Sequence, residues 1–79
     1  MLVEVRVFSG LERFLEKKRF GEPFSVEIQE GSSLRDLLEQ IGIPEDQVFT
    51  TLIDGKHREP DYILNEGERV SLFPPVGGG

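Results

Sequence analysis

Residues 33–44 contain the strongest structural signal in this sequence, that of one short amphipathic helix. Ser33 and Asp36 form an S-x-x-D capping box, while Gly42 and Pro44 mark the end of the helix. One apolar stripe is formed at positions i, i+3, i+4 and i+7 by Leu34, Leu37, Leu38 and Ile41. Because a helix with a single apolar stripe has to bury it against another element, this helix is expected to lie across one face of a sheet.

Strand-like segments lie on both sides of the predicted helix. Residues 2–8 alternate between apolar and polar, residues 23–30 follow the same period, and one or two helical turns are expected between them at residues 11–15. After the helix, residues 48–53 and 68–73 are strand-like. The segment between them is irregular or a short edge strand, because Pro60 argues against a central one.

The burial of two segments is less certain from the pattern. In residues 48–53, both Phe49 with Ile53 and Leu52 are plausible core residues, so the buried face stays open. Tyr62 and Leu64 are expected to close the core under a loop. The element order β-β-α-β-(β)-β predicts an α+β fold of the β-grasp (ubiquitin-like) type. Its mixed sheet of four to five strands has one main helix packed across one face.

Composition excludes several classes of function. The chain has 79 residues, no cysteine and a single histidine, His57, which argues against disulfides, thiolate metal sites and histidine-cluster metal sites. Its net charge of −6 argues against nucleic acid as a partner. No signal peptide is visible and no apolar run approaches the roughly 20 residues that cross a bilayer, so a soluble cytoplasmic protein is expected.

The negative charge is concentrated in the middle of the sequence. Between residues 21 and 55, Arg35 is the only basic residue among eight acidic ones. Two interpretations remain open: a solvated surface that confers solubility, or an acidic surface that steers the domain toward basic partners. The basic triplet at residues 17–19 is interpreted as a solvated loop, because no glycine-rich or aromatic cradle accompanies it.

The end of the sequence is the part best suited to chemistry. Residues 1–73 are predicted to form the folded domain and residues 74–79 a flexible C-terminal tail. Pro74 and Pro75 have no N–H to give a sheet, so they end the last strand and begin an extended arm. The tail continues through Val76, Gly77, Gly78 and Gly79. Six residues reach about 20 Å, and glycines fit a channel as narrow as a bare backbone, so the terminal carboxylate is the expected working group.

This ending resembles the sulfur-carrier family that includes MoaD and ThiS, and most closely the small subunit of molybdopterin synthase. The specific likeness lies in F-P-P-V followed by the final Gly-Gly and in D-x-x-L-x-x-G-E-x-V at residues 61–70. The resemblance covers the whole chain, although Gly77 stands where the family usually has another residue.

The resemblance implies a function that depends on partner proteins. An E1-like enzyme of the MoeB or ThiF type would use ATP to adenylate the carboxylate of Gly79, next to Gly78, and a sulfur donor would convert it to a thiocarboxylate. In the molybdopterin version the tail then enters the large synthase subunit, of the MoaE type, and gives its sulfur to a pterin precursor. The chain itself would bind no cofactor and has no phosphate-binding loop.

Strand parity predicts where such partners dock. Val70 and Leu72 share the core face of the last strand, so Phe73 points outward, as does Phe8 in the first strand. If these strands are neighbours, the two rings lie together beside the root of the tail and form a docking patch. The resemblance agrees, since such carriers dock through an apolar patch on this sheet, and His57 is expected to border it without a catalytic role.

Three alternatives to a molybdopterin-type carrier remain. The first is a sulfur carrier of the thiamin type. The second is a ubiquitin-like modifier that uses the same activated carboxylate to form an amide with lysine. The third is a non-catalytic binding module of the same fold with an idle tail.

Overall fold

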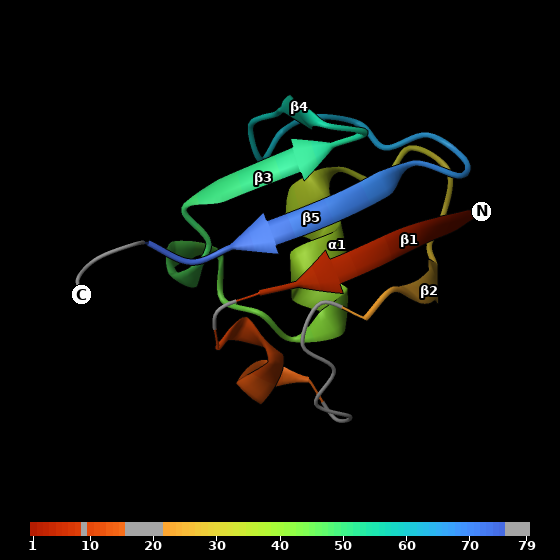
Figure 1. The fold of residues 1–79 in the computed structure, drawn as a ribbon. Coiled ribbons are helices and arrows are strands. Elements are labelled where there is room, and N and C mark those ends of the chain that lie inside the picture. The colour runs from red at the N-terminus through yellow and green to blue at the C-terminus, as the bar shows by residue number, and fades with distance from the viewer. Residues whose placement is uncertain (9, 16–21, 76–79) are drawn as a thin grey trace.

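The computed structural model describes residues 1–8, 10–15 and 22–75, which form a sheet with one α-helix packed across it (Figure 1). The five strands are β1 (Leu2–Val7), β2 (Phe24–Glu27), β3 (Thr50–Ile53), β4 (Lys56–His57) and β5 (Arg69–Phe73). The helix α1 spans Leu34–Ile41, and two short 3-10 helices are η1 (Leu11–Phe14) and η2 (Glu45–Gln47). This is the α+β arrangement that the element order predicts.

The sheet order is β2-β1-β5-β3-β4, so the first and last strands lie side by side in its centre. β5 runs parallel to β1, with Val5 opposite Val70, and antiparallel to β3. β1 and β5 therefore end at the same edge of the sheet, where β3 begins (Figure 1). The segment that follows β5 consequently leaves from the middle of this edge.

The helix ends are formed as their sequence signals predict. The Ser33 hydroxyl accepts from the Asp36 N–H at 3.1 Å, and the Asp36 carboxylate accepts from the Ser33 N–H at 2.9 Å. Gly42 adopts a left-handed φ of 83° and donates to the carbonyl of Leu38. Both ends of α1 are thus closed by local hydrogen bonds, which satisfy backbone groups that the helix itself leaves unpaired.

The core lies between α1 and the helix-facing side of the sheet. Its buried apolar residues are Val3, Val5, Val7, Leu11, Val26, Ile28, Leu34, Leu37, Leu38, Ile43, Ile53, Leu64, Val70 and Leu72. The valines of β1 and the alternate residues of β5 face α1, as period-two geometry requires. Leu64 is buried and Tyr62 packs against the core, which confirms the expected closure under the loop.

The third strand differs from its prediction. It begins at Thr50 rather than at residue 48, and Thr51 and Ile53 are its buried residues. Ile53 was a correct candidate, whereas Leu52 is half-buried on the opposite face and Phe49 is 68% exposed. Parity fails for Phe49 because this residue precedes the strand, where the chain has just left η2.

Other element boundaries also differ from those predicted. β2 is four residues long rather than eight, and the residues expected in a helical turn after β1 form a 3-10 helix. The basic triplet at residues 17–19 lies outside the described residues. Pro60 stands outside the two-residue edge strand β4, as its missing N–H favours.

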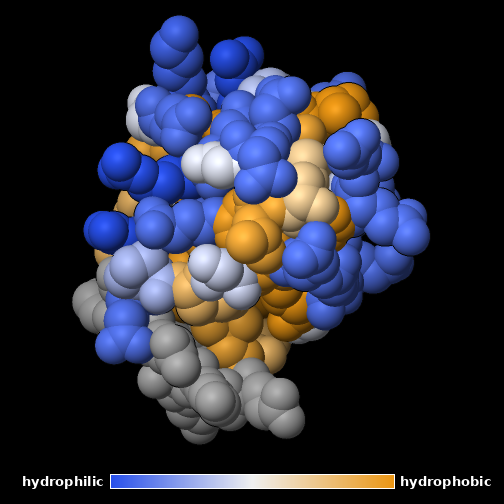
Figure 2. Space-filling view, turned by 90° about the vertical axis from the view of Figure 1, so that its right-hand side faces the viewer, coloured by the Kyte–Doolittle hydropathy of each residue, from blue (hydrophilic) through white to orange (hydrophobic). Residues whose placement is uncertain are grey.

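Seen from the side that faces right in Figure 1, apolar residues remain visible between hydrophilic margins (Figure 2). Large apolar side chains with high exposure include Leu2 at 45% and Ile63 at 51%. In the described part of the chain, no helix is long and apolar enough to cross a membrane.

Candidate functional site

Two aromatic rings lie together on the sheet face opposite α1. The rings of Phe8 and Phe73 are stacked with centroids 4.7 Å apart and an angle of 6° between their planes. The parallel pairing of β1 with β5 produces this contact, and the Phe8 N–H donates to the carbonyl of Leu72 at 3.1 Å. The predicted juxtaposition of the two rings is therefore confirmed. We call Phe8 and Phe73 the aromatic pair.

The aromatic pair stands at the point where the chain leaves the sheet. Phe73 is the last residue of β5, and its carbonyl accepts from the Phe49 N–H at 2.8 Å. The half-buried Pro74 and the exposed Pro75 follow. Because neither proline has an N–H, the ladder cannot continue past Phe73. The rest of the predicted tail, Val76 to Gly79, which includes the residue with the expected reactive carboxylate, lies outside the described residues.

The strand register shows which residues lie beside the aromatic pair on the sheet face opposite α1. Arg6 is opposite Ser71, Ser71 is opposite Leu52, and Leu52 is opposite His57. These four residues form one row across β1, β5, β3 and β4, next to the row that contains the aromatic pair. We call the sheet surface formed by these two rows the open face.

His57 lies at the edge of the open face rather than beside the aromatic pair. The whole of β3 separates its strand from β5. Its Nδ1 atom is 3.7 Å from a carboxylate oxygen of Glu59, and both side chains are more than half exposed. His57 therefore borders the open face but does not lie beside the aromatic pair, next to which it was expected.

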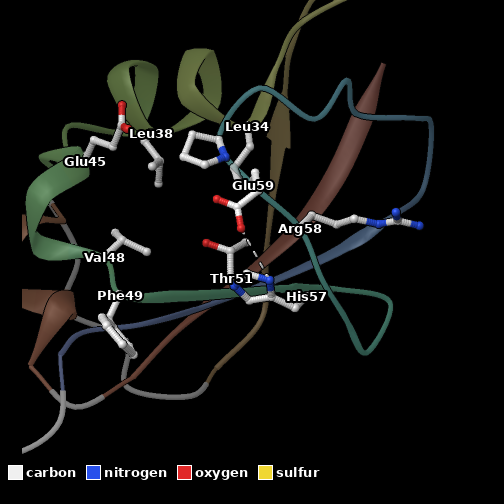
Figure 3. A pocket seen from close by; sticks show the side chains of 10 residues that line it. Leu34, Leu38, Glu45, Val48, Phe49, Thr51, His57, Arg58 and Glu59 are labelled. Carbon is white, nitrogen blue, oxygen red and sulfur yellow. Dashed lines mark ion pairs between the residues drawn. The ribbon is translucent and has the colours of Figure 1, made fainter.

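His57 and Glu59 also line a small pocket at the β4 edge (Figure 3). The pocket measures about 190 Å³, with Leu34 and Leu38 of α1 on one side and Val48 on another. Figure 3 shows Arg58 pointing away from the pocket, and its guanidinium lies over the Tyr62 ring, 4.8 Å from the centroid. The pocket is too small for a drug-sized ligand, which needs about 300 Å³ or more.

The groups with shifted pKa values lie away from the aromatic pair. Hydrogen bonds from the Ser33 backbone and hydroxyl lower the pKa of Asp36 at the start of α1. A hydrogen bond and the charge of Arg35 lower the pKa of Glu45, and the Tyr62 hydroxyl, which donates to Glu68, has a raised pKa. These shifts accompany capping and loop closure, so they describe stability rather than catalysis.

Nothing in the described chain resembles an independent catalytic centre. No group of three or more histidine, aspartate and glutamate side chains within the described residues is placed to hold a metal ion. The features of the site are instead a stacked aromatic pair, a neighbouring row of three polar residues and one leucine, and an exit point for the chain. Such an arrangement can bind another protein and present a chain end to it.

Sequence reasoning identified the aromatic pair but assigned no role to Arg6 and Ser71, which strand parity places on the same outward face. Both have the parity of the aromatic pair, since Arg6 is two residues before Phe8 and Ser71 two before Phe73. The signal was therefore available in the alternation of the strands. What the sequence did not show was that the two residues pair across the β1–β5 interface.

Comparison with known proteins agrees with the fold and with the resemblance seen in the sequence. A family model described as Mut7-C ubiquitin matches residues 1–77. No curated protein sequence matches the chain. The structural neighbours include proteins of the MoaD type, as the sequence analysis expected.

Three solved structures illustrate the likeness. One chain in a complex of subunits 1 and 2 of molybdopterin-converting factor from Helicobacter pylori is 26% identical, with full coverage of both chains and a TM-score of 0.60. A putative molybdopterin converting factor subunit 1 from Pyrococcus furiosus is 22% identical, with 95% and 98% coverage and a TM-score of 0.70. The small archaeal modifier protein 1 of H. volcanii is 18% identical, with 95% and 98% coverage and a TM-score of 0.72.

Proposed function

The chain belongs to the Mut7-C ubiquitin family, and from this premise we propose that it is a ubiquitin-like sulfur carrier. The carboxylate of Gly79 is the group that carries sulfur. A carboxylate is a poor electrophile, because its charge is delocalised over two oxygens. It accepts sulfur only after a partner enzyme has converted it to an acyl-adenylate with ATP, which releases pyrophosphate. Attack by a sulfur donor then displaces AMP and leaves a thiocarboxylate.

The observation that carries this proposal is the position of the aromatic pair. It marks the end of the central strand β5, where Pro74 and Pro75 terminate the ladder and three glycines follow two residues later. A partner that binds the stacked rings is thereby placed next to the start of a chain end without bulky side chains. Burial of each ring in an interface would contribute about 1.5–3 kcal/mol.

More specifically, we propose that the carrier donates its sulfur in molybdopterin synthesis. The F-P-P-V ending favours this branch over the thiamin branch, and one structural neighbour is a complex of subunits 1 and 2 of molybdopterin-converting factor. On this assignment the protein has two partners, an E1-like adenylating enzyme and a large synthase subunit. Both act in the cytoplasm, where ATP is available.

A second candidate function is protein modification. One structural neighbour is named a small archaeal modifier protein, and its fold is the same. An activated Gly79 carboxylate that meets a lysine amine instead of sulfide forms an amide and releases AMP. The two functions share the activation step and differ only in the nucleophile that follows it.

Intact mass spectrometry separates the two candidates. The chain is incubated with the adenylating enzyme, ATP and sulfide, and replacement of one oxygen by sulfur is expected to raise its mass by about 16 Da. Amide conjugates to lysine without any thiocarboxylate would favour the modifier and contradict the carrier. Adding the large synthase subunit and the pterin precursor then tests the finer assignment by the return of the original mass.

Deletion of Gly78 and Gly79 gives the matching control. The described hydrogen bonds and core contacts lie within residues 1–75, so the free energy of unfolding is expected to stay the same. Transfer of sulfur is expected to disappear, because the reacting carboxylate is displaced by two residues. If the shortened chain kept the full biological activity of the intact chain, the tail would be idle and the protein would be a binding module.

A further inference from the structure

Arg6 differs from the other arginines that the structure describes. Its Nε atom is buried on the open face and has no hydrogen-bond partner. An arginine has five N–H donors and no acceptor, so a buried, unpaired donor of this kind lowers the stability of the folded chain. Such a group in a native structure calls for an explanation.

The remaining described arginines each have a partner. Arg35 donates to Glu45 at 2.7 Å, and Arg69 lies 3.7 Å from a carboxylate oxygen of Glu4. Arg13 donates to the carbonyl of Gly10 and lies over the Phe14 ring, and Arg58 lies over the Tyr62 ring. Arg6 therefore lacks a partner in a molecule with a net charge of −6, where acidic side chains are plentiful.

Arg6 lines a hollow of about 420 Å³ on the open face together with Asp54, Gly55, Arg69 and Ser71. The carboxylate of Asp54, which lines this hollow, and that of Glu4, which lies beside Arg69, are already engaged. Asp54 accepts from the backbone N–H of Arg69 at 2.9 Å, and Glu4 pairs with the Arg69 side chain. The Arg6 guanidinium thus remains available for an acceptor that comes from outside the chain.

The position of Arg6 indicates which acceptor this is. Arg6 is two residues from Phe8 on the same face, so a surface that covers the aromatic pair also covers Arg6. A carboxylate matches the planar donor fork of arginine, and exclusion of water at an interface strengthens that contact. The occupant must therefore combine an apolar area with a carboxylate beside it.

We propose that Arg6 is a docking residue which binds an aspartate or glutamate side chain of the adenylating enzyme when that enzyme covers the aromatic pair. This inference rests on the proposed function for the identity of the partner. Ser71, opposite Arg6 in the strand register, supplies a second polar group at the same contact. The unpaired guanidinium then lowers the stability of the unbound chain, and complex formation removes this penalty.

The test compares Arg6→Met with Arg35→Met in the full-length chain. Methionine keeps an unbranched apolar stem and removes the donors at either position. Affinity for the adenylating enzyme is measured by calorimetry at low and at high salt, and the free energy of unfolding by urea titration. Inorganic phosphate is titrated separately while the Nε–H resonance of Arg6 is followed by NMR.

We expect Arg6→Met to raise the Kd by about tenfold or more, as truncation of one member of a desolvated charge pair does. Its stability is expected to be equal to or higher than that of the wild type, because a buried unpaired donor is removed. Arg35→Met is expected to leave the Kd unchanged. Opposite effects on binding and on stability are the signature that a merely structural arginine would not give.

Three outcomes would overturn the docking role. The first is an unchanged Kd for Arg6→Met, and the second is a higher Kd accompanied by a loss of folding stability that accounts for it. The third is saturable binding of phosphate at Arg6 while Arg6→Met binds the adenylating enzyme with the affinity of the wild type. A different result would contradict the proposed carrier function. A wild-type chain that binds the enzyme through Arg6 but gains no sulfur would contradict the carrier and leave the docking role intact. No binding of the wild type would overturn both.

Discussion

Phe49 and Ile53 show how far a single residue's burial depends on its surroundings. The two residues share strand parity and hydrophobicity, yet Phe49 is 68% exposed and Ile53 is 2% exposed. Ile53 lies within β3, where the pleat directs it toward α1, while Phe49 lies before the strand begins. Hydrophobicity alone therefore does not identify the core residue of this pair.

Substitution of these two residues is expected to have unequal effects. Phe49→Ser is expected to change the free energy of unfolding by no more than about 0.5 kcal/mol, because its side chain is already largely in water. Ile53→Ala is expected to lower it by about 2–5 kcal/mol, through lost burial and a cavity in the core. Urea denaturation of both variants checks this, and an equal loss would contradict the exposure of Phe49.

At the scale of elements, α1 depends on its capping box. Ser33→Ala removes the acceptor for the Asp36 N–H and is expected to lower the free energy of unfolding by about 1 kcal/mol. Ser32→Ala is the matched control, because its described hydrogen bonds involve only its backbone. A comparable loss for both serines in urea denaturation would argue against the cap as the cause.

The same cap makes α1 sensitive to acid. Hydrogen bonds from Ser33 lower the pKa of Asp36 in the folded state, so its stabilising effect is fully present above the unfolded pKa. The effect is lost as the pH falls through the lower, folded pKa, that is, from about pH 5 downward. Asp36→Asn is expected to flatten the dependence of the urea midpoint on pH in this range, and an unaltered dependence would count against this account.

At the scale of the whole molecule, the sheet is completed by its last strand. β5 lies between β1 and β3, so no fragment without it contains a continuous sheet. Fragments 1–55 and 56–79 are each expected to lack a cooperative unfolding transition and to regain one when mixed. Circular dichroism during heating measures this, with the intact chain as control. Cooperative unfolding of fragment 1–55 alone would show that the central pairing is dispensable.

This dependence on long-range pairing explains which predictions succeeded. Signals contained in a few neighbouring residues, such as the capping box at Ser33 and the left-handed Gly42, appear in the structure as expected. The alternation of β1 and β5 predicted their buried faces for the same reason. The start of β3 was placed two residues too early, because Val48 and Phe49 lie between the end of η2 at Gln47 and the first strand residue, Thr50.

The sequence by itself determined the element order, the apolar faces and a chain end rich in proline and glycine, because these follow from local geometry and composition. Strand parity and the expected β-grasp arrangement placed Phe8 beside Phe73, but only the tertiary structure showed that the two rings stack and that Arg6 is left without an acceptor. The reason is physical: both facts depend on the parallel pairing of β1 with β5, which joins residues more than sixty positions apart. No pattern within a short stretch of sequence specifies a contact between such distant segments.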